Sequence, residues 1–196
     1  MLSSPRPGMI TELHTDMRRA LHRRGAVGLS KALRVLFNNQ GLQALVIYRF
    51  GRTLDRLEVS LSGKLIAALI RPVFNFAACL VRKAYGIDLD QSADIAPGLF
   101  IGHFGGIALS RCRIGPHCAI QQQVRLEPAT TGEAGPVLGA GVWVGAHARI
   151  YGPVNVGNGA TIGAGAVVTE DVPARCLVLG NPGRIAQRDY DNHAFL

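Results

Sequence analysis

The chain has 196 residues, of which 48% are hydrophobic and 17% are charged. This composition excludes a disordered chain, because the apolar fraction is large enough to form a core. Residues 1–86 carry 14 Lys and Arg against 4 Asp and Glu, whereas residues 87–196 carry 7 against 9. The change in charge places a domain boundary near Gly86, between a basic module and a nearly neutral one.

The basic module, residues 1–86, has the spacing of amphipathic α-helices. A proline near the middle of the last helix predicts a kink at Pro72. A membrane-spanning helix is not expected, because Arg71, Pro72 and Asn75 interrupt the longest apolar stretch. We expect helices over residues 11–24, 30–38, 41–57 and 62–84.

Four basic residues gather in the first expected helix: Arg18, Arg19, Arg23 and Arg24. The simplest interpretation is a solvated helix face. An anionic membrane surface or an anionic partner is the alternative, because adjacent basic residues add their attraction. Nucleic acid is not expected as a partner, since no interleaved aromatic residues or recognised motif accompany the charge.

The second half of the chain repeats every six residues. From Leu138 onward, a small or short residue follows each aliphatic residue by four positions, and glycine follows many of the aliphatic residues directly. A helix does not repeat at six and a flat strand repeats at two, so this period predicts a short strand and a turn, repeated. The aliphatic positions are Leu89, Ile95, Ile101, Ile107, Ile114, Ile120, Leu126, Leu138, Val144, Ile150, Val156, Ile162 and Val168.

Three hexapeptides form one triangular coil, which predicts a left-handed parallel β-helix with strands stacked about 4.8 Å apart. The overall expectation is an α+β fold, in which a helical module precedes the β-helix of residues 87–185. Residues 127–137 break the pattern and predict a loop ejected from a coil, where solenoids often build binding sites. Residues 186–196 are left as a C-terminal tail.

His103 is the candidate catalytic residue of this β-helix. It lies two residues after the inward-facing Ile101 and is flanked by glycines, which permit close approach of a ligand. An 18-residue coil would place position 85 beneath His103, with Asp88 near the same corner. A carboxylate there would fix the imidazole tautomer and leave the other ring nitrogen as a base. Such a pair can take a proton from a hydroxyl that attacks a thioester. An ordinary exposed histidine is the alternative.

The four cysteines show no metal-ligand or redox spacing, and no metal site is expected. Cys112 and Cys118 fall at repeat positions that suit small hydrophobic residues, so no covalent acyl-enzyme is expected. With no signal peptide in the sequence, reduced cysteines and a cytoplasmic protein are expected.

The stretch from Ile87 to Arg184 resembles the serine acetyltransferases of the hexapeptide acyltransferase superfamily. The resemblance extends weakly to Tyr48-Arg49-Phe50-Gly51 in the helical module. The motifs that carry it are Ile87-Asp88, Gly98-Leu99-Phe100-Ile101-Gly102-His103, Val144-Gly145-Ala146-His147-Ala148-Arg149-Ile150-Tyr151-Gly152-Pro153-Val154, Ile162-Gly163-Ala164-Gly165-Ala166-Val167-Val168 and Gly180-Asn181-Pro182-Gly183-Arg184.

The resemblance implies that His103 is the general base and that Asp88 orients it. It also implies acetyl-CoA as co-substrate, in an outer groove between the subunits of a homotrimer with intersubunit active sites. The pantetheine would bond to backbone groups near two pairs of small residues. The CoA-binding candidates are Gly145, Ala146, Gly163, Ala164 and Arg184.

Three departures from the family pattern concern the acceptor. Gly102 stands where the family has aspartate, Ala134-Gly135-Pro136 replaces arginine-histidine-proline, and Ser110-Arg111 replaces glycine-glutamate. Loss of side chains that grip an amino acid removes charge-assisted hydrogen bonds. We therefore expect an acetyl-CoA-dependent O-acetyltransferase whose acceptor is a sugar hydroxyl, as in a surface-polysaccharide precursor, rather than free L-serine.

Two alternatives remain open at this stage. A divergent serine O-acetyltransferase would hold its amino acid with new residues such as Arg111, Arg125 or Glu127. A non-catalytic β-helix scaffold would not bind CoA. A lipid-linked glycan acceptor would place the protein at the inner face of the membrane, where the basic helices would contact anionic lipid.

Overall fold

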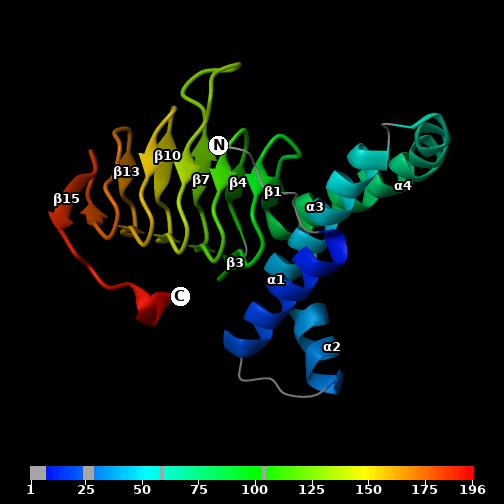
Figure 1. The fold of residues 1–196 in the computed structure, drawn as a ribbon, viewed down its shortest axis with the longest axis horizontal. Coiled ribbons are helices and arrows are strands. Elements are labelled where there is room, and N and C mark those ends of the chain that lie inside the picture. Colours follow the sequence, from blue (N-terminus) through cyan, green and yellow to red (C-terminus); the bar gives the residue numbers. More distant parts are fainter. Residues whose placement is uncertain (1–7, 24–28, 58–59, 103–104) are drawn as a thin grey trace.

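The structure, a computed structural model, describes residues 8–23, 29–57, 60–102 and 105–196. Four helices precede a three-sided parallel β-solenoid that extends away from them (Figure 1). The α+β prediction, with helices followed by a β-helix, is confirmed. The helices are α1 (Met9–Arg23), α2 (Leu29–Asn38), α3 (Gln40–Leu57) and α4 (Leu61–Tyr85).

Helix α3 lies at the centre of the helical module and contacts α1, α2 and α4 as well as β1 and β3. Gly41 is the point where α3 meets the first coil: a Cβ atom there would lie 2.6 Å from the Cβ of Ile101. Glycine at this position therefore lets the helix backbone rest directly on the solenoid.

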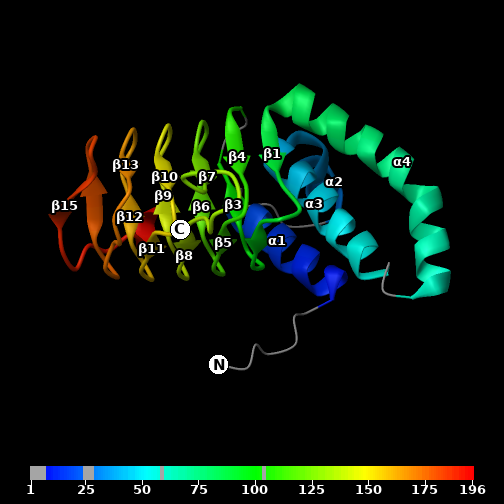
Figure 2. The same cartoon turned by 90° about the horizontal axis from the view of Figure 1, so that it is seen from above.

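Helix α4 is defined by both of its ends. The side chain of Ser60 accepts a hydrogen bond from the N–H of Gly63, which caps the N-terminus. Gly86 ends the helix in the left-handed conformation, with φ of 62°. The helix continues through Pro72 and bends along its length (Figure 2), as the predicted kink requires. By length and composition alone, residues Ser62–Tyr85 would suffice to cross a membrane.

The strands form three parallel faces. The first contains β1 (Ile87–Leu89), β4 (Ile107–Leu109), β7 (Arg125–Glu127), β10 (Arg149–Tyr151) and β13 (Val167–Val168). The second contains β2 (Asp94–Ile95), β5 (Arg113–Ile114), β8 (Val137–Leu138) and β11 (Asn155–Val156). The third contains β3 (Phe100–Ile101), β6 (Ala119–Ile120), β9 (Trp143–Val144), β12 (Thr161–Ile162), β14 (Leu177–Leu179) and the antiparallel β15 (Arg184–Gln187).

The predicted inward positions form the core of the solenoid. Except for Leu89, which is partly buried, every aliphatic residue of the six-residue pattern is buried. From Leu138 onward, the small or short residues four positions later are buried as well. The pattern succeeds because each short strand directs alternate side chains inward, and the solenoid has one narrow interior in which they stack.

Coil length varies along the chain. Strands in the C-terminal half pair 18 residues apart, as Arg149 with Val167. The first coil is longer, because Ile87 pairs with Ile107. The expectation that position 85 lies beneath His103 falls on a residue outside the described ranges. Next to it, Gly86 lies beside Gly105 and Gly106.

One coil contains an additional hexapeptide. Arg125 pairs with Arg149, 24 residues later, because a segment between β7 and β8 leaves the solenoid. This loop projects from the edge of the solenoid above β7 and β10 in Figure 1.

The last residues return toward the solenoid. The side-chain amide of Asn192 donates to the carbonyl of Gly141 at 3.0 Å, and the ring of Phe195 lies 5.2 Å from that of Trp143. A 3₁₀ helix, η1 (His193–Phe195), ends the chain against the corner of the third face.

Candidate active site

His103 lies outside the described residues, so the site is built from its surroundings. On one side, Gly102 donates to the carbonyl of Ile120, continuing the third face. On the other, Gly105 and Gly106 lie against Gly86, where a Cβ atom would be 3.1 Å from the N of Gly106. The start of β1 is therefore adjacent to the segment that follows His103.

Asp88 is the second residue of β1, with its side chain 51% exposed. The guanidinium of Arg82, at the end of α4, lies 3.8 Å from the Asp88 carboxylate. A pocket of about 290 Å³ opens beside it between α3, α4 and β1, lined also by Asn75, Asp90 and Gln91. Asp88 thus stands on the outer surface, at the edge of a hollow and available for contact with another group.

Outward side chains of the first face form rows that run along the solenoid. Asp88 pairs with Ala108, Ala108 with Arg125, and Arg125 with Arg149. The small side chain of Ala108 separates Asp88 from Arg125. This row starts at Asp88, near the helical module, and passes the base of the ejected loop. One continuous surface therefore connects Asp88 with the residues at the base of that loop.

Arg125 and Glu127 form an ion pair on this surface. The two guanidinium nitrogens Nη2 and Nε lie 2.8 and 3.2 Å from Oε1 of Glu127. The hydrogen bond to Glu127, and then its charge, raise the pKa of Arg125 above the ordinary value. Their sequence position, immediately before the ejected loop, places a cation and an anion together at its base.

Gln121 and Gln123 lie next to the segment that contains His103, although the sequence pattern did not predict them as site residues. A Cβ atom at Gly102 would lie 2.4 Å from Oε1 of Gln121, and one at Gly106 would lie 2.1 Å from Oε1 of Gln123. The side-chain amides of the following coil therefore cover both ends of the segment. The signal that could have identified them is the register of the longer coil, which brings Phe100 beside Ala119.

The candidate CoA residues lie on the third face, near the C-terminal end. Gly145 and Gly163 are buried, whereas Ala164 is exposed. A Cβ atom at Gly145 would lie 2.6 Å from the N of Ala164, and one at Gly163 would lie 2.2 Å from Cδ2 of Leu179. Gly145 is therefore required for the backbone stacking of neighbouring coils, whether or not a ligand approaches it, whereas at Gly163 the flexible Leu179 side chain is the nearest neighbour.

Arg184 begins β15 and is exposed on the surface. Its guanidinium lies 3.6 Å from the carboxylate of Glu170, and both side chains are largely exposed. An exposed pair of this kind is weakly held. Arg184 is thus free to exchange Glu170 for an anionic ligand such as a phosphate.

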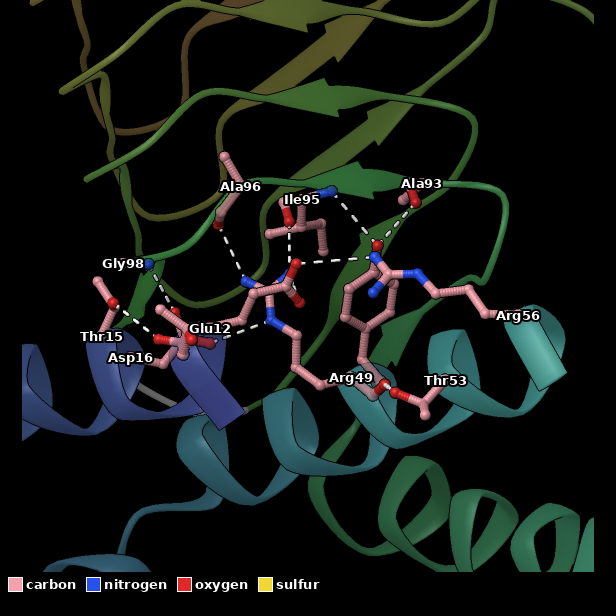
Figure 3. A network of polar contacts seen from close by, with 12 residues as sticks. Glu12, Thr15, Asp16, Arg49, Thr53, Arg56, Ala93, Ile95, Ala96 and Gly98 are labelled. Carbon is pink, nitrogen blue, oxygen red and sulfur yellow. Dashed lines mark hydrogen bonds and ion pairs between the residues drawn. The ribbon is translucent and has the colours of Figure 1, made fainter. Parts of the chain in front are cut away.

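A buried ionic network attaches the helices to the segment before His103 (Figure 3). Arg49 Nε lies 3.1 Å from Asp16 Oδ2, and Arg49 also donates to the carbonyls of Ile95 and Ala96. The other oxygen of Asp16 accepts from the N–H of Gly98 at 2.6 Å. Burial raises the pKa of the Asp16 carboxyl, although the charge and hydrogen bond of Arg49 act in the opposite direction.

Tyr48 and Arg19 extend this network. The Tyr48 hydroxyl donates to the carbonyl of Ala93 at 2.8 Å and accepts from the N–H of Ile95. Arg19 donates to the carbonyl of Gly98. Arg19 is therefore not part of a solvated helix face, and that simple interpretation of the basic cluster is wrong for this residue. The helical module fixes the backbone that leads to His103.

Cysteine and histidine side chains outside this region offer no further centre among the described residues. Cys112 and Cys118 are buried, and burial raises their thiol pKa values to about 12 and about 11. His117 and His147 occupy exposed corners with φ of 58° and 63°. Within the described ranges, no three His, Cys, Asp or Glu side chains form a group that could hold a metal ion.

Known proteins match both the repeat and the whole chain. The bacterial transferase hexapeptide (six repeats) family model matches residues 135–170. The serine acetyltransferase of Synechococcus elongatus is 33% identical over 159 residues, which make up 80% of this chain and 61% of that protein. The serine acetyltransferase of Mycobacterium tuberculosis is 30% identical over 180 residues, or 90% of this chain and 73% of that protein. The chain belongs to the serine acetyltransferase family.

The structural comparison agrees with this membership. A solved serine acetyltransferase in complex with CoA matches 91% of this chain and 69% of its own, with a TM-score of 0.72 and 28% identity. This chain spans about three fifths of the length of the Synechococcus relative. The preference for a sugar hydroxyl as acceptor is not supported, because the relatives are named for serine; the alternative, a serine O-acetyltransferase, is favoured.

Proposed function

We propose that the protein transfers the acetyl group of acetyl-CoA to the hydroxyl of L-serine. The observation that carries this proposal is the outer row of the first face. Asp88 and the Arg125–Glu127 pair stand on one surface, beside the segment that contains His103. Family membership supplies the reaction class, and the residues on this surface supply groups that suit it.

In the proposed reaction, His103 is the general base and Asp88 orients it. The serine hydroxyl attacks the thioester carbonyl carbon while its proton passes to the imidazole. The carbon–sulfur bond then breaks, and the proton returns from the imidazolium to the departing thiolate of CoA. The Asp88 carboxylate, exposed on β1, would accept the other imidazole N–H and stabilise the positive charge that forms.

Arg125 and Glu127 are proposed to hold the amino acid. A guanidinium matches the serine carboxylate, and a carboxylate matches its ammonium group. The two side chains are paired with each other in the absence of substrate and are 47% and 23% exposed. A zwitterion would exchange both partners at once, so neither charge would be left unpaired. This role replaces the side chains that the family has at the end of the ejected loop.

The CoA site is proposed on the third face. The small residues Ala146 and Ala164 leave the surface of the stacked coils open to an extended pantetheine chain, with Gly145 and Gly163 keeping the coils close. Arg184, held only by an exposed contact with Glu170, would meet a CoA phosphate.

The proposed assembly is a homotrimer in the cytoplasm, with each site shared between two subunits. The CoA candidates lie on the third face and Asp88 on the first. A neighbouring subunit would bring its third face against the first face of this one, since one subunit alone presents the two sets of groups on different faces.

Release of CoA from acetyl-CoA, followed by thiol titration, tests the proposal. The acceptors are L-serine, homoserine and a panel of free and nucleotide-linked sugars. We expect turnover with serine, its loss in His103→Ala and a marked decrease in Asp88→Asn. Turnover with a sugar and none with serine would overturn the assignment of L-serine as the acceptor. If no acceptor reacts and CoA does not raise the melting temperature, a scaffold would be the better account.

A further inference from the structure

Helix α4 presents an apolar stripe that no described part of the chain covers. Six large side chains on it are between 52% and 81% exposed. They repeat at helical spacing over about 22 Å of helix length, on the side away from the buried Ala67 and Phe74. The stripe consists of Leu65, Ile66, Leu69, Val73, Phe76 and Leu80.

Basic residues also lie along α4. Lys83 is exposed on the same side of the helix as the stripe, and Lys64 is exposed about a quarter turn or more from its edge. Arg71 and Arg82, on that same flank, are paired with Asp55 and Asp88. An apolar stripe bordered by Lys and Arg is the pattern of a helix that lies in the surface of a membrane.

The net charge of the helical module has the same sign. Residues 1–86 include only four acidic residues. Glu12 and Asp16 are buried in the ionic network with Arg49, Asp55 has a partner in Arg71, and Glu58 lies outside the described residues. A second copy of this chain would bring an equally basic module against the stripe, whereas an anionic lipid surface would attract it.

Spanning the bilayer is a different arrangement, and the packing of α4 argues against it. The opposite side of the helix is fixed to α3: the Phe74 ring is 5.9 Å from that of Phe50, and a Cβ atom on Gly51 would lie 2.6 Å from it. Insertion across a membrane would remove these contacts and would place Arg71 in hydrocarbon. Lying flat on the surface retains both.

We propose that the exposed stripe of α4 binds an anionic lipid surface, with the stripe among the acyl chains and the flanking basic residues at the headgroups. The inference does not depend on the proposed acetyl transfer. The solenoid and Asp88 remain outside the lipid, because the stripe lies on the side of α4 away from its packed face.

Co-sedimentation with vesicles tests this inference on the full chain. The vesicles contain phosphatidylcholine alone or phosphatidylcholine with phosphatidylglycerol. We expect binding to the anionic vesicles, weaker binding to the neutral ones, and a decrease with added salt. Failure to bind anionic vesicles would overturn the proposal, whatever the result of the acetyl-transfer assay.

A matched pair of variants locates the contact. Leu69→Gln/Phe76→Gln changes the stripe, and Ile10→Gln/Phe37→Gln changes two apolar side chains of similar exposure on α1 and α2. We expect the first to lose binding by roughly a hundredfold, about tenfold for each side chain withdrawn from lipid, and the second to bind like wild type. Equal losses in both would overturn the proposal.

Light scattering distinguishes lipid binding from association of the stripe with a second copy of the chain. All four substituted side chains are exposed, so both variants should melt like wild type. The mass of the protein in lipid-free solution is measured for both variants by light scattering. We expect it to be unchanged. A smaller assembly for Leu69→Gln/Phe76→Gln, with unchanged vesicle binding, would show that the stripe joins copies of the chain and would overturn lipid binding.

Discussion

Asp16 and Arg49 form a 3.1 Å ion pair in which both side chains are almost completely buried. The pair connects α1 with α3, and each partner also bonds the backbone between β2 and β3. That backbone continues through Ile101 to His103. The charge pair therefore determines how the helices sit on the coil that carries the candidate base.

Removing Arg49 should destabilise the protein strongly. Arg49→Met would leave the buried Asp16 carboxylate without its cation and two carbonyls without a donor, at a cost of about 3–5 kcal/mol in the free energy of unfolding. Urea denaturation measures this. Arg56→Met is the matched control, because Arg56 lies on the same helix and pairs with Glu12 at 3.7 Å but is 43% exposed. Its loss should cost less than about 1 kcal/mol. A similar decrease in the free energy of unfolding for both variants would contradict the expectation that burial makes the Arg49 ion pair the more important one.

Gly145 should be needed for the stacking of the coils even when no ligand is bound. Gly145→Ala would place a Cβ atom 2.6 Å from the backbone N of Ala164, so the coils must move apart. We expect the free energy of unfolding to decrease by about 1–3 kcal/mol without any CoA present. Gly8→Ala is the control, because no atom lies within 4 Å of that Cβ position. Unchanged stability of Gly145→Ala would mean that the coils do not require this glycine.

Substitution of Arg125 or Glu127 should weaken the binding of serine, the acceptor, without weakening the binding of acetyl-CoA, the donor. Arg125→Leu is expected to raise the KM for serine by roughly 10- to 150-fold, the equivalent of one charge-assisted hydrogen bond, with little change in the KM for acetyl-CoA. Steady-state kinetics measures both values. Arg149→Leu, which changes the next exposed arginine in the same row, is the control and should leave serine binding unchanged. Equal effects of the two variants would indicate general loss of positive charge.

The ejected loop should be removable without loss of the solenoid. Deletion of residues 128–133 leaves three residues between β7 and β8, the same number that joins β10 to β11. The free energy of unfolding should therefore change by about 1 kcal/mol or less, because the deletion shortens a loop and leaves the coil intact. Serine turnover should decrease at least about tenfold, since binding residues concentrate on loops held by a rigid scaffold. Loss of cooperative thermal unfolding would show that the loop stabilises the coil.

The buried thiols should be unreactive in the folded protein. Burial raises the pKa of Cys112 to about 12 and that of Cys118 to about 11. At pH 8 the thiolate fractions are then about one in ten thousand and one in a thousand. We expect iodoacetamide to label the partly exposed Cys79 first, and Cys112 and Cys118 only after unfolding in urea. Peptide mass spectrometry identifies the labelled sites, and rapid labelling of Cys112 in the native protein would contradict this prediction.

The sequence by itself determined the solenoid and its interior. A period of six with aliphatic residues such as Ile150 and Ile162 admits one arrangement, because each short strand has a single inward face and each coil must cover the next. The same period located the extra residues before Val137. Approximate helix boundaries followed from the spacing of apolar residues, and the bend in the last helix from Pro72, which acts on the local backbone alone.

Only the tertiary structure decided how the parts meet. The two additional residues in the first coil changed what lies beside Gly105, whereas the period of six showed only one extra residue before Ile114. From the sequence, Arg19 and Arg49 are only basic residues on two helices. The structure shows that they bond carbonyl and carboxylate groups far away in the sequence and so attach these helices to the solenoid. The exposure of Phe76 beside the buried Phe74 likewise depends on where α3 lies. These properties arise from contacts between distant segments, which local patterns do not encode.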